Sequence, residues 1–267
     1  MEGRSFFSSR FIGMTITFTE PTYSVWTLVT KIEEDNYQSP AANLGTSMAW
    51  ALFACHNPHN HGEEALVRIH MQIPKLGTEF EPPHQRARQA KPELESIAEG
   101  ELTRLTNIGA QHAPIIIGKQ QGVQSDNEMV PGGYILYLAM TKLRGRRLSD
   151  GIIGDSLFWR LPLATRDLIR ETFKIAYQDL LDADVAPVCG MRNLLWEGPS
   201  EPGDGSEVNI YFANFVDADH IGSSRAREWH NVFFIAWGLA MPPKPRSGVT
   251  SWYQDGFDDT FMGEWGL

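Results

Sequence analysis

The sequence has few cysteines, because only Cys55 and Cys189 occur among 267 residues. Two thiols far apart in the chain build neither a disulfide framework nor a zinc site of four thiolates. A disulfide-rich secreted scaffold is therefore excluded, and reduced thiols in an intracellular protein are expected. Cys189 has no histidine near it in the sequence, so we expect a buried structural thiol there rather than a nucleophile.

Positive charge and long apolar runs are also scarce. Lys and Arg number 23 against 33 Asp and Glu, a formal net charge of -10, and such a field repels phosphate backbones and anionic lipid surfaces. The longest apolar run, residues 232–241, has about half of the roughly 20 residues that a transmembrane helix needs. The N-terminus has no apolar core of a secretory signal. We expect a cytoplasmic protein with neither nucleic acid nor membrane as a partner.

What is present is the composition of a globular protein, with 42% hydrophobic and 21% charged residues. In the first half, apolar runs and alternation predict strands at residues 23–32, 48–55, 65–73, 114–118 and 133–141, and a helix at 92–107. In the strand 65–73 the polar residues Arg68, His70 and Gln72 alternate with apolar ones. That pattern predicts a core on one side of the sheet only.

The second half is predicted to be mainly helical. We expect helices at 155–161, 163–182 and 224–239, and a hairpin made of 194–196 and 208–216. The apolar stripe of the long helix consists of Leu168, Ile169, Phe173, Ala176, Leu180 and Leu181. The fold class is α+β. We divide the chain into an N-terminal half, residues 1–139, and a helical half, residues 140–267, which together form one structural unit.

Three segments, taken in order, resemble a known family. They are GYILYLAMTKLRG at 133–145, RDLIR at 166–170 and RNLLW at 192–196. They are similar to segments of the divergent kinase-like proteins abundant in fungi, within the wider family of protein kinases and aminoglycoside phosphotransferases. The resemblance covers about residues 45–240. It implies a two-lobed protein kinase-like fold, here with a shortened C-terminal lobe.

The family resemblance also implies a set of residues for phosphoryl transfer, and the first of these is altered here. The family's strand lysine corresponds to Arg68, whose broad planar guanidinium differs from a compact ammonium. The glutamate that pairs with this lysine corresponds to Glu101, or to Glu99 two positions earlier. We expect an ion pair between Arg68 and Glu101, with a role either in the site or in the structure alone.

The catalytic loop implied by the resemblance has lost its base. With Asn193 as the last residue of the pattern His-x-Asp-x-x-x-x-Asn, the Asp and His positions hold Val188 and Ala186. The metal-binding Asp is replaced by Asn214, and a neutral amide is a poor ligand for Mg²⁺. Gly45 is the only glycine between residues 13 and 62, so the glycine-rich loop over the phosphates is missing too. Efficient phosphotransfer is therefore not expected.

The resemblance implies a cleft between two lobes, lined by Arg68, Glu101, Met140, Asn193 and Asn214. In a first reading this cleft binds a small apolar molecule and converts it by isomerisation, cyclisation or elimination, as in specialised metabolism, without metal or other cofactor. In a second, the chain is a non-catalytic pseudokinase scaffold or regulator. Weak residual phosphotransfer is a third possibility. The sequence leaves the ligand and the oligomeric state open.

Asp217 joins Arg68, Glu101 and Asn214 as a candidate catalytic residue. With Asp219 and His220 it follows the family's Phe position, at the mouth of the implied cleft. Solvated loop residues are the more frequent case, although a general acid or base would be useful there.

A second cluster of chemistry-bearing side chains precedes strand 65–73. It consists of Cys55, His56, His59, His61 and Glu63. These side chains have enough donors for zinc, but the intervening turn residues are expected to make the imidazoles diverge. We therefore expect a solvated hairpin tip and no metal site.

Overall fold

The computed structural model describes residues 5–43, 45–94, 97–149, 156–187, 189–198, 208–215, 219–220, 228–241 and 265–267, with the backbone alone for 97–99 and 219–220. The chain splits into two compact units. Unit 1 comprises Met1–Ser96 and Ile116–Lys142, and unit 2 comprises Ile97–Ile115 and Leu143–Leu267. The architecture is α+β, as the sequence predicts.

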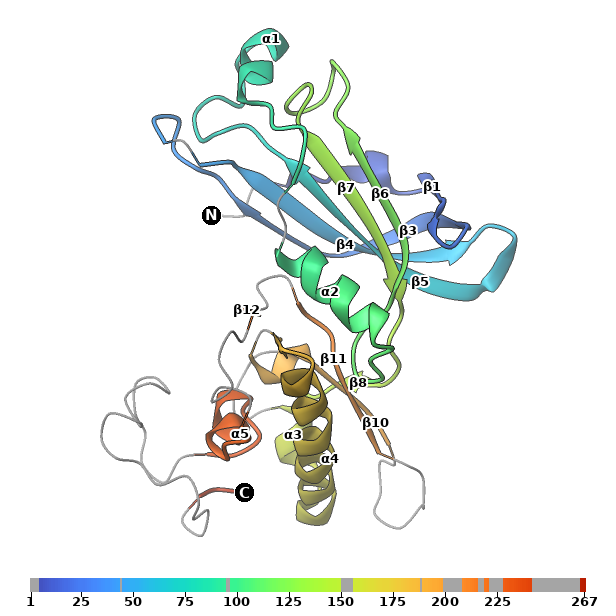
Figure 1. Cartoon of the computed structure of the whole chain (residues 1–267), viewed down its shortest axis with the longest axis vertical. Helices are drawn as coiled ribbons and strands as arrows, with labels where there is room; N and C mark the ends of the chain where they lie inside the picture. The colour runs from blue at the N-terminus through green and yellow to red at the C-terminus, as the bar shows by residue number, and fades with distance from the viewer. Residues whose placement is uncertain are drawn as a thin grey trace. The chain divides into compact units, whose positions relative to one another are not determined.

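Unit 1 is built on a seven-stranded antiparallel sheet (Figure 1). In the order of hydrogen-bonded neighbours its strands are β1 (Thr15–Phe18), β3 (Ser24–Tyr37), β4 (Met48–Asn57), β5 (Asn60–Gln72), β7 (Tyr134–Thr141), β6 (Ile116–Val123) and β2 (Glu20–Pro21). The unit also holds the short helices η1 (Ser9–Phe11), α1 (Pro83–Arg86) and η2 (Ala87–Gln89). The five strands predicted for this half are present, but β3 continues to Tyr37 and β6 continues to Val123, through residues expected in a loop. Strands β1 and β2 were not expected.

Strands β1 and β2 are separated by Thr19 alone, yet they pair with opposite edges of the sheet. β1 hydrogen-bonds to β3, and β2 hydrogen-bonds to β6, where Pro21 lies opposite Gly118. The side chain of Phe18 packs against Gly118, since a methyl group there would lie 2.5 Å from Cγ of Phe18. Glycine at this strand position therefore permits the close approach that links the two edges.

Both faces of the sheet are buried. One face carries the main apolar core, which includes Phe6, Phe7, Phe11, Phe53, Val67, Ile69 and Met71. On the other face Arg68, His70 and Gln72 are each at most 3% exposed. The prediction of a one-sided core is therefore wrong. Alternation identified which residues share a face, but it did not identify whether that face is covered.

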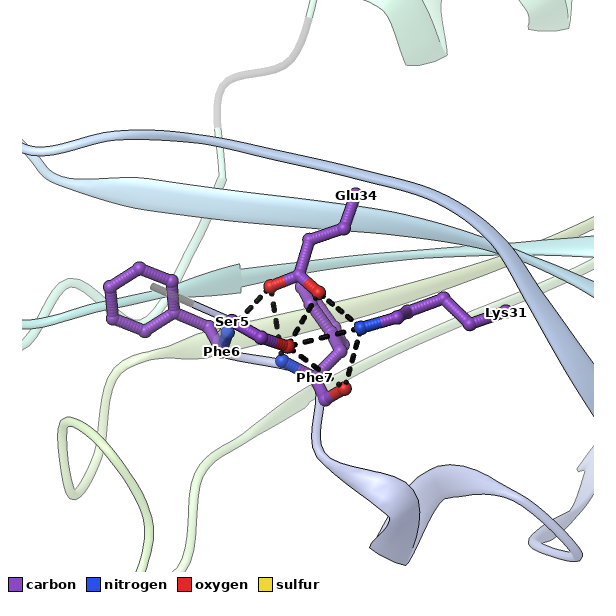
Figure 2. Close-up of polar contacts among 5 residues, drawn as sticks. All are labelled: Ser5, Phe6, Phe7, Lys31 and Glu34. Carbon is purple, nitrogen blue, oxygen red and sulfur yellow. Dashed lines mark hydrogen bonds and ion pairs between the residues drawn. The ribbon is translucent and has the colours of Figure 1, made fainter. Parts of the chain in front are cut away.

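The N-terminal segment is held against β3 by a polar cluster (Figure 2). Oε1 of Glu34 accepts hydrogen bonds from the backbone N–H of Phe6 at 2.5 Å and of Phe7 at 3.2 Å, and Oε2 accepts the Ser5 hydroxyl at 2.8 Å. The Lys31 ammonium donates to Glu34 at 2.5 Å and to the Phe7 carbonyl at 3.0 Å. These bonds fix Phe6 and Phe7 in the core, where each is 2% exposed.

The donors of this cluster set the charge state of Glu34. Burial alone would raise its pKa, but Lys31, Ser5 and the two backbone amides outweigh burial and hold the pKa of Glu34 below its ordinary value. A carboxyl whose pKa is lower in the folded than in the unfolded chain stabilises the fold above its ordinary pKa. That contribution is lost as the pH falls through the lowered pKa.

Unit 2 is organised around α4 (Leu163–Asp182), whose bounds match the prediction. Its buried side carries Ile169, Phe173, Ala176, Leu180 and Leu181, whereas Leu168, also expected there, is 43% exposed at the edge of the stripe. Rings surround Phe173 at centroid distances of 5.4 to 6.1 Å, from Tyr177, Phe212, Trp229, Phe234 and Trp237. This aromatic cluster is the centre of the unit's core.

The other elements of unit 2 are short. They are α2 (Ile97–Asn107), β8 (Arg146–Arg147), α3 (Leu157–Arg160), β9 (Val185–Ala186), η3 (Met191–Asn193), β10 (Leu194–Glu197), β11 (Asn209–Phe212), β12 (Asp219–His220) and α5 (Val232–Ala236). The predicted hairpin is β10–β11, extended by β8 to three strands. Among the residues described, no helix has both the length and the apolar character to cross a membrane.

Glu34→Gln should weaken the N-terminal attachment, because it keeps an oxygen acceptor for the amides but removes the charge that pairs with Lys31. We expect the free energy of unfolding at pH 7 to fall by about 1–2 kcal/mol, measured by urea denaturation. The exposed neighbour Glu33→Gln should change it by less than about 0.5 kcal/mol. The difference between wild type and Glu34→Gln should shrink as Glu34 is protonated at low pH; a difference that stays constant would contradict the cluster's role.

Phe173→Ala should lower the free energy of unfolding by about 3–5 kcal/mol, because it removes the ring on which the aromatic cluster packs and leaves a cavity. Ile175→Ala is the matched control on the same helix, since Ile175 is 64% exposed and its truncation should have little effect. Chemical denaturation of both variants provides the comparison. Equal losses would show that the buried side of α4 is misassigned.

Candidate functional site

The five residues predicted to line a cleft divide between the two units. Arg68 and Met140 lie in unit 1, on β5 and β7. Glu101, Asn193 and Asn214 lie in unit 2, on α2, on η3 and just after β11. The predicted ion pair between Arg68 and Glu101 thus joins residues of different units, and it stays a prediction.

In unit 1, the pairing of β5 with β7 places Arg68 and Met140 on one face. Leu66 lies opposite Met140, and Arg68 lies opposite Leu138, and opposed residues of antiparallel strands share a face. The Arg68 guanidinium lies over the ring of Trp50 on β4, with 4.8 Å between Cζ and the ring centroid. Arg68 is 3% exposed, so its charge is desolvated and the quadrupole of the indole helps to stabilise it.

His70 lies next to Arg68 on this face, and the sequence reasoning missed it as a site residue. It lies opposite Trp50 and is 2% exposed, and within the described part of the chain its Nε2 has no hydrogen-bond partner. Burial, and to a lesser degree the charge of Arg68, lower the pKa of His70 to about 3. The imidazole is therefore neutral near pH 7, where it offers an acceptor or a donor but cannot shuttle protons between two charge states.

A cavity of about 420 Å³ lies at the far end of the same face. Met48, in its lining, is opposite Gln72, which follows His70 in the polar row of β5. The cavity is lined by Thr46, Met48, Lys91, Glu93, Leu94 and Tyr134. Burial raises the pKa of Tyr134 well above its ordinary value, so this phenol stays protonated and can donate a hydrogen bond.

In unit 2, the β10–β11 hairpin brings Asn193 and Asn214 together. Leu194 lies opposite Phe212, and the N–H of Ala213 donates to the carbonyl of Asn193 at 2.8 Å. Asn193 is 6% exposed, while Asn214 is half-buried. The two residues at the positions where the resemblance implies a metal site are therefore neighbours in the fold, and their neutral amides do not fit Mg²⁺, which is held chiefly by carboxylates.

Glu101 is fixed in the same unit as these amides. It is 5% exposed on α2, and this helix is anchored by an ion pair of 3.3 Å between Arg104 and Asp184. Beyond the helix, the N–H of Phe212 donates to the carbonyl of His112 at 2.8 Å. The chain that follows α2 is thereby tied to β11, the strand that leads to Asn214.

The remaining candidates fall partly outside the described residues, where Val188 and Asp217 lie. For Glu99, Asp219 and His220 the structure describes only the backbone, and the last two form strand β12, paired with β9. No group of three or more His, Cys, Asp or Glu within the described residues is arranged to hold a metal ion.

Two expectations about Cys and His residues are corrected. Cys189 is exposed rather than buried, because it lies in the loop before Gly190 and η3, whereas Cys55 is the buried thiol. The imidazoles of the hairpin do not all diverge, since the rings of His56 and His61 lie 4.4 Å apart. Pairing of β4 with β5 continues to the tip of the hairpin and brings these two residues together.

No protein-family model and no curated protein matches the chain. Among solved structures, it is similar to WaaP in complex with acyl carrier protein, at 13% identity over 77% of this chain and 70% of that chain, with a TM-score of 0.42. It is also similar to the CAK complex from Chaetomium thermophilum bound to ATP-gamma-S, at 12% identity over 72% of this chain and 49% of that chain, with a TM-score of 0.35.

The buried His70 predicts a pH dependence of stability. Its pKa is lower in the folded than in the unfolded chain, so its contribution is present above the unfolded value of about 6.5 and is lost as the pH falls toward the folded value. Between pH 7 and pH 5 we expect the free energy of unfolding to fall by about 2 kcal/mol from this group alone.

His70→Gln should flatten this pH dependence, while His59→Gln at the exposed hairpin tip should leave it unchanged. Urea denaturation at several pH values between 7 and 5 gives, for each protein, the slope of the free energy of unfolding against pH. The slope is the decisive quantity, because it is independent of how far the substitution itself destabilises the fold. If His70→Gln has the slope of wild type, the buried neutral state of His70 is wrong.

Proposed function

We propose that this chain is a kinase-like protein that has lost phosphotransferase chemistry and that binds and converts a small apolar molecule. The observation that carries the first part is that Asn193 and Asn214, both with neutral side chains, are neighbours in the fold. The backbone N–H of Ala213, next to Asn214 in the chain, donates to the backbone carbonyl of Asn193 at 2.8 Å. Neither amide carries the charge with which a carboxylate holds Mg²⁺ against water.

The geometry of Arg68 supports the same loss. Its guanidinium is stacked on Trp50 and is 3% exposed, whereas a lysine presents a compact ammonium on a flexible stem. The charge of Arg68 is therefore held over the indole of Trp50, whereas the lysine implied by the resemblance carries its charge on a mobile stem.

The second part of the proposal rests on the face of unit 1 that carries Arg68. One cation lies there among Trp50, Leu138 and Met140, and the cavity of about 420 Å³ at the end of this face has the size of small-ligand sites, about 300–1,000 Å³. An isomerisation, cyclisation or elimination needs little more than positioning and one acid or base. Such a reaction requires no metal and no nucleotide.

A non-catalytic scaffold is the second candidate, and one observation favours it. Arg68 is almost fully buried and stacked on Trp50, which is also what a purely structural cation needs. In that case Arg68 stabilises the fold and no ligand depends on it.

Purified protein should therefore show no Mg·ATP-dependent phosphoryl transfer above background, measured as ADP release with and without candidate acceptors. The reason is the neutral pair of Asn193 and Asn214. A turnover near roughly 1 s⁻¹, the low end of the range for kinases, would contradict the proposal.

Arg68→Ala, with the exposed Arg88→Ala as control, separates the two candidates. The probe is the neutral dye N-phenyl-1-naphthylamine, whose fluorescence rises in an apolar site, and the thermal midpoint is measured on the same samples. The small-molecule reading expects at least about tenfold weaker dye binding with a nearly unchanged midpoint. The scaffold reading expects a loss of roughly 3–5 kcal/mol in stability with dye binding retained by the folded protein, and that result would overturn the ligand site.

A further inference from the structure

Two arginines of α4 lie on the aromatic side chains of α3, within unit 2. The guanidinium of Arg166 lies over the ring of Trp159 at 5.1 Å, and that of Arg170 over the ring of Phe158 at 5.3 Å. The two rings meet edge to face, with centroids 5.1 Å apart. Because Arg166 and Arg170 are four residues apart, they occupy the same side of the helix. Both charges therefore lie where the first turns of α4 pack against α3. We call this place, formed by Arg166, Arg170, Phe158 and Trp159, the corner of unit 2.

Three donor atoms at this corner are buried and have no acceptor among the residues that the structure describes. The side chain of Arg170 is 5% exposed; its Nε donates to the carbonyl of Leu239 at 2.7 Å and its Nη1 to Asp167 at 2.6 Å, but Nη2 has no partner. Nε of Arg166 and Nε1 of Trp159 are also buried without a hydrogen-bond partner. A buried donor left unpaired is costly, most of all on a charged group, and such atoms often mark a site for an ion or water.

Charge and helix geometry add to these donors. Among the described residues, Arg170 is ion-paired with Asp167, whose side chain is 52% exposed, and Arg166 has no ion pair, so the described charges of this corner sum to a net positive charge. The N-terminus of α4 has no acidic residue in its first turn, and Pro162 at its N-cap makes no side-chain capping bond. The positive end of this 20-residue helix is therefore uncompensated. Side chains of a helix tilt toward its N-terminus, which brings the guanidinium of Arg166 to this end.

We propose that this corner binds an oxyanion, a phosphate or carboxylate group, through Nη2 of Arg170, Nε of Arg166 and Nε1 of Trp159. All three atoms can only donate, so an acceptor with several oxygens satisfies them, whereas a cation does not and a single hydroxyl oxygen accepts at most two of the three bonds. Stacking on Phe158 and Trp159 holds the guanidiniums in place before the ligand arrives, and Arg planes bind oxyanions with directional hydrogen bonds. The site is independent of the residues on which the proposed function rests.

The test is a titration of the full chain with inorganic phosphate and with acetate, against chloride at equal ionic strength. Isothermal titration gives the affinity, and the thermal midpoint gives a second readout, since a ligand that binds only the folded chain raises the midpoint. We expect phosphate, acetate or both to bind and to raise the midpoint beyond the effect of chloride. Binding of phosphate alone identifies a phosphoryl ligand, and binding of acetate as well identifies a carboxylate-sized site.

Three variants locate the site. Trp159→Phe keeps a ring beneath Arg166 but removes the indole N–H, and we expect about tenfold weaker binding from the loss of one hydrogen bond to a charged group. Arg166→Gln should weaken binding further, and if it does not fold, Trp159→Phe decides. The control is Arg160→Gln, since Arg160 is exposed on α3 and reaches only the carbonyl of Ser156, at 3.4 Å. No oxyanion effect beyond chloride in wild type, or unchanged affinity in Trp159→Phe, would overturn the proposal.

Discussion

The seven residues from Thr15 to Pro21 pair with both edges of the sheet in unit 1, and the rest of that unit depends on this closure. Phe18 and Gly118 make it possible, because the ring occupies the space that any side chain at 118 would need. A sheet whose edges are both paired has no strand edge open to another chain along this segment. The polar cluster of Ser5, Lys31 and Glu34 then fixes the chain that precedes the closing segment.

The burial of both sheet faces determines the charge state and hydrogen bonding of Arg68, His70 and Gln72, which form the polar row of β5. Gln72 is fully engaged, since its Oε1 accepts the N–H of Lys91 at 2.8 Å and its Nε2 donates to the carbonyl of Gln89 at 2.6 Å. His70 is kept neutral, and Arg68 is held on Trp50. The row therefore offers a fixed cation and an uncharged imidazole on an aromatic surface. That set suits binding and positioning more than proton transfer.

The sequence predicted the elements whose signal is local. The apolar stripe of α4 predicted where this helix begins and ends, and apolar runs predicted the positions of β4 and β7. Patterns of eight or more residues indicate burial directly. Strands β1 and β2 have four and two residues, and only their distant partners define them. Short strands of this kind carry no periodic signal.

The candidate site could be predicted only in part, for the same physical reason. The family resemblance named Asn193 and Asn214, and the hairpin brings these two together. The alternation of polar and apolar residues placed Arg68 and His70 on one face of the sheet. It did not show that this face is buried, so the neutral state of His70 could not be predicted. Arg166 and Arg170 look in the sequence like solvated charges of a helix, and only the structure shows that each has a buried donor atom beside the aromatic rings of α3.

The central proposal is that Asn193 and Asn214 of unit 2 do not hold a metal ion for nucleotide chemistry. Equilibrium dialysis of ATP against the protein, with and without Mg²⁺, tests it most directly, because it needs no acceptor substrate. The account predicts that Mg²⁺ leaves ATP affinity unchanged or lowers it. An affinity that rises about tenfold or more with Mg²⁺, and that loses this gain in Asn214→Ala, would contradict the claim.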